Sequence, residues 1–212
     1  MGSSRLPGKV LRPIAGVPLL GHILGRLEDL RHRATLVVAT SVQSADDAVA
    51  AYCSDQGALC FRGSEQDVLG RYYECAKQYS FGQIVRLTGD NPFTDIEELD
   101  RLIELHLREG NDYSHSIGEL PIGVGAEIFR FAALERSHLE GRSPHHREHV
   151  NEYLLEHPEL FKTGRLESVP PEKRMPDLRL TVDTEEDYRR ACHVAEHARG
   201  RWASTAEAIE LC

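Results

Sequence analysis

Apolar and polar positions follow two rhythms along this chain of 212 residues, one typical of helices and one typical of buried strands. Leucine and isoleucine recur at every third or fourth position over residues 18–30, which predicts an amphipathic helix. Short apolar runs at residues 35–40 and 83–87 predict strands buried on both faces. The same patterns predict further strands at 58–62, 113–116, 126–131 and 178–182, and helices at 45–56, 66–79, 95–109, from 132 and from 184. This alternation predicts the α/β class, with three layers (αβα) around a mostly parallel sheet.

The composition does not break anywhere along the chain, so we expect a single domain spanning residues 1–212. Residues 110–150 are less regular, and we expect a substrate-facing or dimerisation insertion there. The formal net charge of −9 argues against binding to nucleic acid or to an anionic membrane, since both require a broad basic face. No apolar run approaches the roughly 20 residues of a membrane span, and no signal peptide is recognisable. We therefore expect a cytoplasmic protein.

Cysteines are spread along the chain without a CxxC pair, at Cys53, Cys60, Cys75, Cys192 and Cys212. An odd and widely spaced set argues against a disulfide framework and against a cysteine zinc site. We expect reduced thiols that pack as small apolar groups.

The first nine residues have the composition of a phosphate-binding loop. Gly2 and Gly8 allow backbone N–H groups to approach an anion, while Arg5 and Lys9 supply positive charge for phosphate oxygens. Five residues separate the two glycines and Val10 follows the lysine, so the loop does not match that of P-loop ATPases. The alternative is a solvated terminal tail.

Two aspartates follow predicted strands. Asp90 comes after Gly89 at the end of the strand at 83–87, and Asp183 comes between the strand at 178–182 and the next helix. Two carboxylates at strand ends suit Mg²⁺, which takes one or two protein carboxylates and fills its other positions with phosphate oxygens and water. The alternative makes Asp90 a turn residue and Asp183 a helix cap.

These motifs resemble those of the cytidylyltransferase family that includes the spore-coat polysaccharide and CMP-sugar-acid synthetase proteins. The resemblance lies in residues 2–10 and 16–20, in Leu-Thr-Gly-Asp-Asn-Pro at 87–92 and in Thr-Val-Asp-Thr-Glu-Glu-Asp at 181–187. It implies a Rossmann-like nucleotide-diphospho-sugar transferase fold. In that fold Asp90 and Asp183 hold Mg²⁺, the side chains of Arg5 and Lys9 act in catalysis on the β- and γ-phosphates, and the nucleotide-binding residues include Gly2, Ser3, Ser4, Gly8 and Gly89.

Further matches extend the resemblance to the base and the acceptor. Residues 61–69 resemble the family segment near cytosine and ribose, which implies nucleotide binding by Arg62, Ser64 and Asp67. A helix N-cap explains Ser64 equally well. Residues 123–129 and 147–153 are similar to segments that face the acceptor, which implies substrate binding by Glu127, Arg147 and His149. An aspartate common in the first of these segments is replaced around Gly125, so the acceptor stays open.

Two histidines, one just before the second segment and one within it, have the spacing of a metal-binding pair. His145 and His149 stand four residues apart, a spacing at which two helical histidines can bind zinc. No third ligand or HExxH pattern accompanies them, which favours a solvated or substrate-facing helix.

The implied reaction is attack by a 2-keto-3-deoxy sugar acid or a sugar phosphate on the α-phosphorus of CTP, with release of pyrophosphate, in the biosynthesis of surface polysaccharides. The resemblance also implies a homodimer. In the family an apolar strand precedes the loop, and Met1 coincides with a methionine at its end, so we expect about eight residues, one strand, ahead of residue 1. The alternatives are a glycosyltransferase that uses a nucleotide sugar, and a truncated, non-catalytic binding or assembly module.

Overall fold

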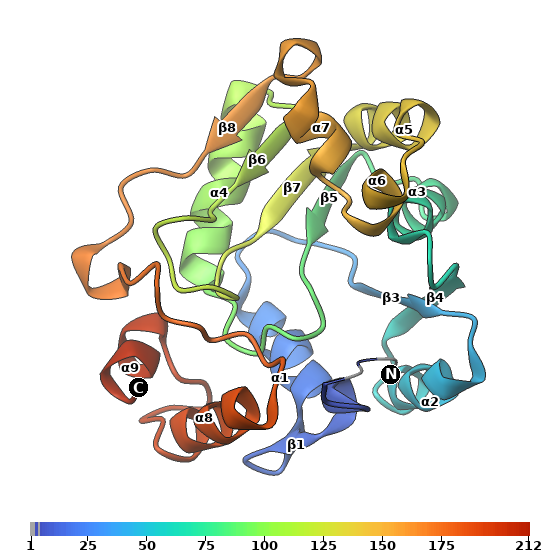
Figure 1. Cartoon of the computed structure of the whole chain (residues 1–212). Helices are drawn as coiled ribbons and strands as arrows, with labels where there is room; N and C mark the ends of the chain where they lie inside the picture. The colour runs from blue at the N-terminus through green and yellow to red at the C-terminus, as the bar shows by residue number, and fades with distance from the viewer. Residues whose placement is uncertain (1–2, 4) are drawn as a thin grey trace.

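Figure 1 shows the computed structural model, which describes residue 3 and residues 5–212. The predictions for Gly2 and Ser4 therefore lie outside the described residues. None of the described helices is long and apolar enough to cross a membrane.

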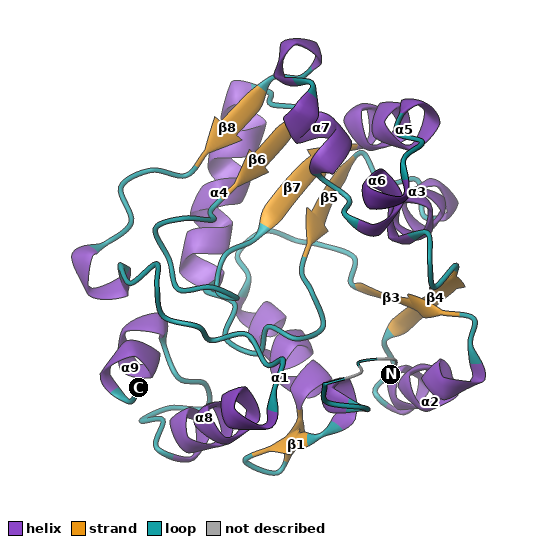
Figure 2. Ribbon diagram, viewed as in Figure 1, coloured by secondary structure: helices purple, strands orange, loops and turns teal. Residues whose placement is uncertain are grey.

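The central strands form two groups, which Figure 2 shows apart from each other. Strand β3 (Val37–Ser41) pairs in parallel with β4 (Leu59–Gly63). A four-stranded sheet has the order β5-β7-β6-β8, with bounds Gln83–Arg86, Glu127–Arg130, Tyr113–His115 and Thr163–Arg165. Strand β7 runs antiparallel to β5 and β6, whereas β6 and β8 are parallel. The four-stranded sheet is therefore mixed, with β7 as its antiparallel strand. The pairs β3–β4 and β6–β8 are parallel.

Helices cover both faces of the four-stranded sheet. Helix α4 (Ile96–Glu109) packs Leu99 and Leu102 against Ile128 of β7. On the opposite face, α3 (Val68–Gln78), α5 (Phe131–Glu140) and α7 (Glu152–Glu156) pack their apolar side chains around Phe129. Because neighbouring residues of a strand point to opposite faces, Ile128 and Phe129 lie in different cores. The predicted three-layer α/β, Rossmann-like architecture is confirmed.

The remaining elements surround this sheet. A short hairpin of β1 (Pro13–Ile14) and β2 (Val17–Pro18) precedes α1 (Leu19–Arg26). Helix α2 (Asp47–Asp55) follows β3, and α6 (Pro144–Glu148) lies between α5 and α7. Helices α8 (Glu185–Glu196) and α9 (Thr205–Glu210) bring the C-terminus beside α1 and its hairpin (Figure 1). Turns of 3-10 helix lie at Lys9–Leu11, Leu27–Asp29, Ser44–Asp46, Pro158–Leu160 and Pro171–Lys173.

The strand predicted at residues 178–182 is wrong. The segment forms only an isolated parallel bridge between Arg179 and Ile122. Its backbone N–H groups donate to two different segments, from Leu180 to Ile122 and from Val182 to Asp90, both at 2.8 Å. Its apolar run reflects burial against α1 and α8 and not a ladder with one neighbouring strand. The first predicted helix is also shorter than expected, because α1 ends at Arg26 and continues as 3-10 helix.

Strands β3 and β5 each have one open edge. Among the described residues, β3 pairs only with β4 and β5 only with β7. A cavity of about 720 Å³ is lined by Val38 and Ala39 of β3, by Ile84 and Val85 of β5, and by residues of α1, α3 and α4. The expectation of a strand ahead of residue 1 stays a prediction, and this cavity is where the sheet is interrupted.

Candidate active site

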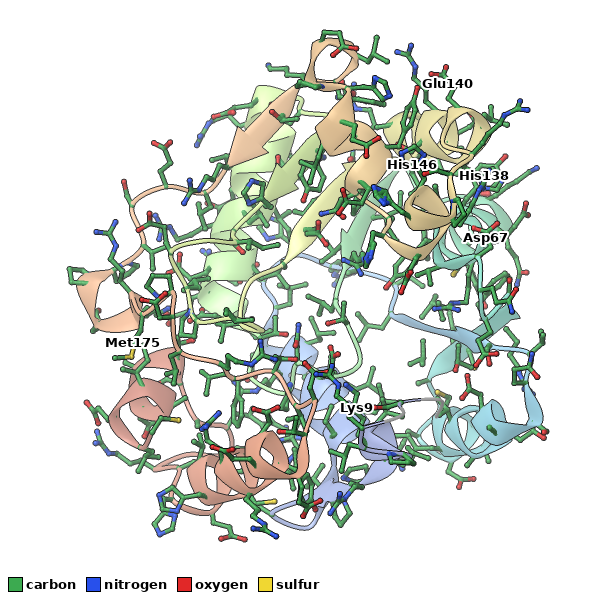
Figure 3. The ribbon with its side chains drawn as sticks, viewed as in Figure 1. Lys9, Asp67, His138, Glu140, His146 and Met175 are labelled. Carbon is green, nitrogen blue, oxygen red and sulfur yellow. The ribbon has the colours of Figure 1, made fainter. Side chains whose placement is uncertain are left out.

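Lys9 brings Asp90 and Asp183 together. Its Nζ atom lies 2.9 Å from Oδ1 of Asp183 and 3.2 Å from Oδ2 of Asp90. The turn that carries it begins at Gly8, whose φ of 70° lies in the left-handed region that favours glycine. The lysine side chain, labelled in Figure 3, is only 12% exposed. Asp90 lies 81 positions and Asp183 lies 174 positions after Lys9 in the sequence, yet both carboxylates meet its ammonium group.

A turn after β5 holds Asp90. The hydroxyl of Thr88 donates to Oδ1 of Asp90 at 2.6 Å, and the backbone carbonyl of Asp90 accepts the N–H of Val182 at 2.8 Å. A Cβ atom on Gly89 would lie 3.3 Å from the side chain of Val10, so the N-terminal loop packs closely on this turn. The loop and both aspartate segments are therefore joined directly.

Asp183 stands one residue before the cap of α8. Thr184 is the N-cap residue, and it forms a capping box with Asp187. The Asp187 carboxylate accepts the backbone N–H groups of Asp183 and Thr184, at 3.1 and 2.9 Å. The alternative in which Asp183 caps the helix is thus wrong, and its carboxylate faces Lys9 instead.

Cations outnumber carboxylates in this cluster. Asp183 also pairs with Arg5 at 3.3 Å and with Arg179 at 2.9 Å, so three cationic side chains meet two carboxylates. Burial by itself raises the pKa of Asp183, but the hydrogen bond and charge of Lys9, aided by Arg5 and Arg179, outweigh it and lower the pKa below its ordinary value. The excess of positive charge suits a polyanion such as a triphosphate.

The donors of this cluster also fit a divalent cation. Both aspartates place an oxygen within 3.2 Å of one positive atom, the Lys9 Nζ. Carboxylate oxygens are the ligands that Mg²⁺ prefers, and two of them leave positions for phosphate. Asp90 and Asp183 are therefore the described residues of this cluster that could hold the ion.

The residues predicted near the base hold the ends of β3 and β4 in place. The guanidinium of Arg62 donates to the carbonyls of Ser41 at 3.0 Å and Gln43 at 2.9 Å, and it pairs with Asp47 at 2.7 Å. Arg62 thereby fixes the loop after β3. Among the hydrogen bonds and ion pairs of the described residues, none joins Arg62 to Lys9.

Ser64 and Asp67, the other two residues predicted near the base, lie at the start of α3. Asp67 is its N-cap residue, since its carboxylate accepts the N–H of Gly70 at 2.7 Å. Ser64 accepts the N–H of Asp67 at 3.0 Å. The alternative in which Ser64 caps the helix is therefore wrong by three residues. Ser3 accepts the N–H of Leu6 at 3.2 Å and orders the start of the loop.

The predicted acceptor residues lie around α6. Arg147 donates to the carbonyl of His138 at 2.9 Å and pairs with Asp67 at 3.5 Å. Figure 3 shows Asp67, His138 and His146 together near α3, α5 and α6, apart from Lys9. His149 ends α6 and is exposed. The structure thus joins one residue of the base segment to the acceptor segment.

Glu127 lies beneath this surface and is only 4% exposed. Its carboxylate pairs with Arg86 and accepts from the Tyr113 hydroxyl at 2.5 Å and the Asn151 amide at 2.8 Å. The pKa of Tyr113 is raised, mainly because the hydroxyl is buried and further because the carboxylate of Glu127 lies next to it. Glu127 therefore acts on the acceptor segment through Asn151, two residues from His149.

Sequence reasoning missed Arg179, Arg86, Tyr113 and Asn151. Arg179 interrupts an apolar run four residues before Asp183, a signal that could have marked it. Asn151 lies within residues 147–153, the segment that resembles an acceptor-facing segment of the family. Arg86 and Tyr113 stand in strands of the sheet. Only the structure shows that Arg86 lies opposite Glu127, and that Tyr113, which lies opposite Phe129, reaches Glu127 with its hydroxyl.

Comparisons with known proteins agree with this geometry. The family model described as cytidylyltransferase matches residues 1–209. The spore coat polysaccharide biosynthesis protein SpsF of Bacillus subtilis (strain 168) is 40% identical over 193 residues, which are 89% of this chain and 80% of that protein.

Solved structures give the same result. A cytidylyltransferase from Leptospira borgpetersenii serovar Hardjo-bovis superposes with a TM-score of 0.91 at 34% identity, covering 99% of this chain and 89% of its own. A CMP:2-keto-3-deoxy-manno-octonic acid synthetase complexed with CTP has a TM-score of 0.67 at 18% identity, covering 92% and 94%, and shows the fold alone. The protein whose loop places Lys9 between Asp90 and Asp183 therefore belongs to the cytidylyltransferase family, and is a nucleotidyltransferase.

Proposed function

We propose that this enzyme uses CTP and Mg²⁺ to activate a 2-keto-3-deoxy sugar acid or a sugar phosphate for surface polysaccharide biosynthesis, releasing pyrophosphate. The observation that carries the proposal is the convergence of Asp90 and Asp183 on Lys9, with Arg5 alongside. The similarity to SpsF, a spore coat polysaccharide biosynthesis protein, supports the biosynthetic role, and the CTP complex of the sugar-acid synthetase supports the nucleotide.

The charged residues would share the triphosphate. Asp90 and Asp183 hold Mg²⁺, which supplies charge neutralisation to the phosphate oxygens. Lys9 and Arg5, which lie beside these carboxylates, would bind the β- and γ-phosphates. Catalysis then rests on in-line positioning and charge stabilisation, with no covalent intermediate on the protein.

The other predicted residues would orient the two substrates. Arg62, Ser64 and Asp67 order the segment between β4 and α3, where we place cytosine and ribose. Arg147 and His149 face the acceptor, while buried Glu127 positions their segment through Asn151. Gly89 keeps the loop and the Asp90 turn close enough to enclose the triphosphate.

Pyrophosphate release from CTP tests the proposal, with a panel of 2-keto-3-deoxy sugar acids and sugar phosphates as acceptors. Asp90→Asn and Asp183→Asn should each lower kcat about 100-fold or more, because several kcal/mol of charge stabilisation is removed. Glu186→Gln is the matched control, since this exposed carboxylate on α8 pairs with Arg190 and with no other cationic side chain among the described residues.

Near-normal turnover in both aspartate variants would refute the assignment of the metal site. Stabilisation of the chain against heat by a UDP-sugar, and not by CTP with Mg²⁺, would refute the choice of nucleotide.

A further inference from the structure

Three side chains on α6 and α7 converge away from the cluster of Lys9, Asp90 and Asp183. His145 and His146 are neighbours on α6, and Glu156 is the last residue of α7. The Nε2 atom of His145 lies 3.0 Å from one carboxylate oxygen of Glu156, and that of His146 lies 2.7 Å from the other. One ligand atom from each residue lies within 4.8 Å of the other two.

The two imidazoles differ in how they are held. His146 is only 12% exposed and stands edge-on to Tyr153, with ring centroids 5.4 Å apart. His145 and Glu156 are each nearly half exposed, at 49% and 45%. One ligand is thus fixed by packing, while the other two open to solvent, from which an ion can enter.

The spacing matches the coordination sphere of a small transition metal ion. Zinc bonds to histidine nitrogen and carboxylate oxygen are about 2.1 Å long, which places tetrahedral ligands about 3.4 Å apart. The two nitrogen–oxygen distances of 3.0 and 2.7 Å are slightly shorter than this value, and the three ligand atoms all lie within 4.8 Å of one another, so small side-chain rotations would place them around an ion. Glu152, whose carboxylate lies 3.7 Å from Nε2 of His145, stands beside the site as a further oxygen donor.

The donor types select the class of metal. Two imidazoles and one carboxylate suit Zn²⁺ and its neighbours, whereas Mg²⁺ prefers oxygen ligands. The site therefore differs in chemistry from Asp90 and Asp183. It also differs from the pair His145 and His149 that the sequence suggested, because the structure supplies His146 and Glu156 as partners.

Binding requires one proton to move. Nδ1 of His146 accepts the N–H of Ser143 at 3.4 Å, so the metal-free ring carries its proton on Nε2. Coordination by Nε2 shifts that proton to Nδ1 and gives up this long contact. The second half of the capping box, from the His146 N–H to the Ser143 hydroxyl at 3.3 Å, is unaffected.

We propose that His145, His146 and Glu156 form a binding site for a divalent transition metal ion of the zinc class. The bound ion joins α6 to α7 and so closes the loop of residues 149–151 between them. This loop carries His149 and Asn151, and Asn151 donates to Glu127. The site is thus a structural clamp beside the acceptor segment.

Titration of the untagged full-length chain with Co²⁺ or Zn²⁺, in excess Mg²⁺, tests the proposal. We expect one Co²⁺ ion per chain with the strong visible bands of a low-coordinate site, and matching Zn²⁺ binding by calorimetry. His145→Gln and Glu156→Gln should each weaken binding at least tenfold. Both side chains are half exposed, so these variants should keep the fold, which circular dichroism without metal checks.

His193→Gln is the matched control, because His193 and His197 form a close pair at the end of α8, with ring centroids 4.3 Å apart, and neither ring pairs with a carboxylate among the described residues. It should bind Co²⁺ like the parent chain. Absence of binding, unchanged binding in both clamp variants, or equal loss in His193→Gln would each overturn the proposal.

Discussion

Single side chains at the candidate active site are held by charge rather than by packing. Lys9 is nearly buried, yet its side-chain ammonium lies within hydrogen-bonding distance of two carboxylates. Arg5 pairs with the same oxygen of Asp183 as Lys9, and Arg179 pairs with the other oxygen. In the absence of a metal, the ammonium group of Lys9 balances the aspartates. Such a cluster costs little folding energy while it keeps the charges in place for a triphosphate.

Asp183→Asn should therefore destabilise the chain by only about 1 kcal/mol at neutral pH. The folded-state pKa of Asp183 lies below the unfolded value of about 3.9. The stabilisation by this carboxylate is thus fully present above pH about 4 and is lost as the pH falls through the folded pKa. Urea denaturation between pH 7 and pH 3 should show the difference between parent and variant shrinking at the acid end. A difference that grows toward low pH would contradict this pKa direction.

At the scale of secondary structure elements, the start of helix α8 positions Asp183. The capping box of α8 fixes Thr184 and Asp187, and so fixes the direction in which Asp183 points. Helix α9 has a capping box of the same kind, formed by Ser204 and Glu207, but it carries no site residue. Both boxes join residues only three positions apart, so they depend on local sequence alone.

Thr184→Ala and Ser204→Ala should each lower the free energy of unfolding by about 1 kcal/mol, the typical value of an N-cap. Only Thr184→Ala should also slow pyrophosphate release, because Asp183 loses its fixed direction. Thermal denaturation and turnover, measured on both variants, check this difference. Equal turnover in the two variants would show that the cap of α8 does not position the aspartate.

At the scale of the whole molecule, the sheet is interrupted between β3 and β5. Each strand leaves one edge open, and both line a cavity of about 720 Å³ together with apolar side chains of the flanking helices. Open edges of this kind accept an added strand, which pairs with both backbones and buries apolar side chains on both faces.

A chain extended ahead of residue 1 by an apolar strand of about eight residues should therefore be more stable than the present one. Each Val or Ile that becomes buried contributes about 1.5–3 kcal/mol, less the cost of ordering. At this chain length a gain of 1 kcal/mol raises Tm by about 2–4 °C. Calorimetry should show a higher Tm than for an extension of equal length made of glycine and serine. Equal Tm values for the two extensions would contradict the prediction.

The sequence by itself determined the local features of this protein. Periodicity located β3 to β7 and α2 to α5 to within a few residues, and turn and cap residues marked where Asp90 and Asp183 leave their segments. These features depend on contacts within a few positions along the chain. The segment at 178–182 shows the limit, because an apolar run indicates burial without showing what its backbone pairs with.

Only the tertiary structure decided which distant groups meet. Lys9 reaches two aspartates 81 and 174 positions away, Glu127 is enclosed by Arg86, Tyr113 and Asn151, and Glu156 joins His145 and His146. Such distances result from how strands and helices pack, and no local pattern encodes them. Motif order showed that these residues belong to a cytidylyltransferase, whereas packing placed Lys9 at the carboxylates, buried Glu127 and made the histidine cluster.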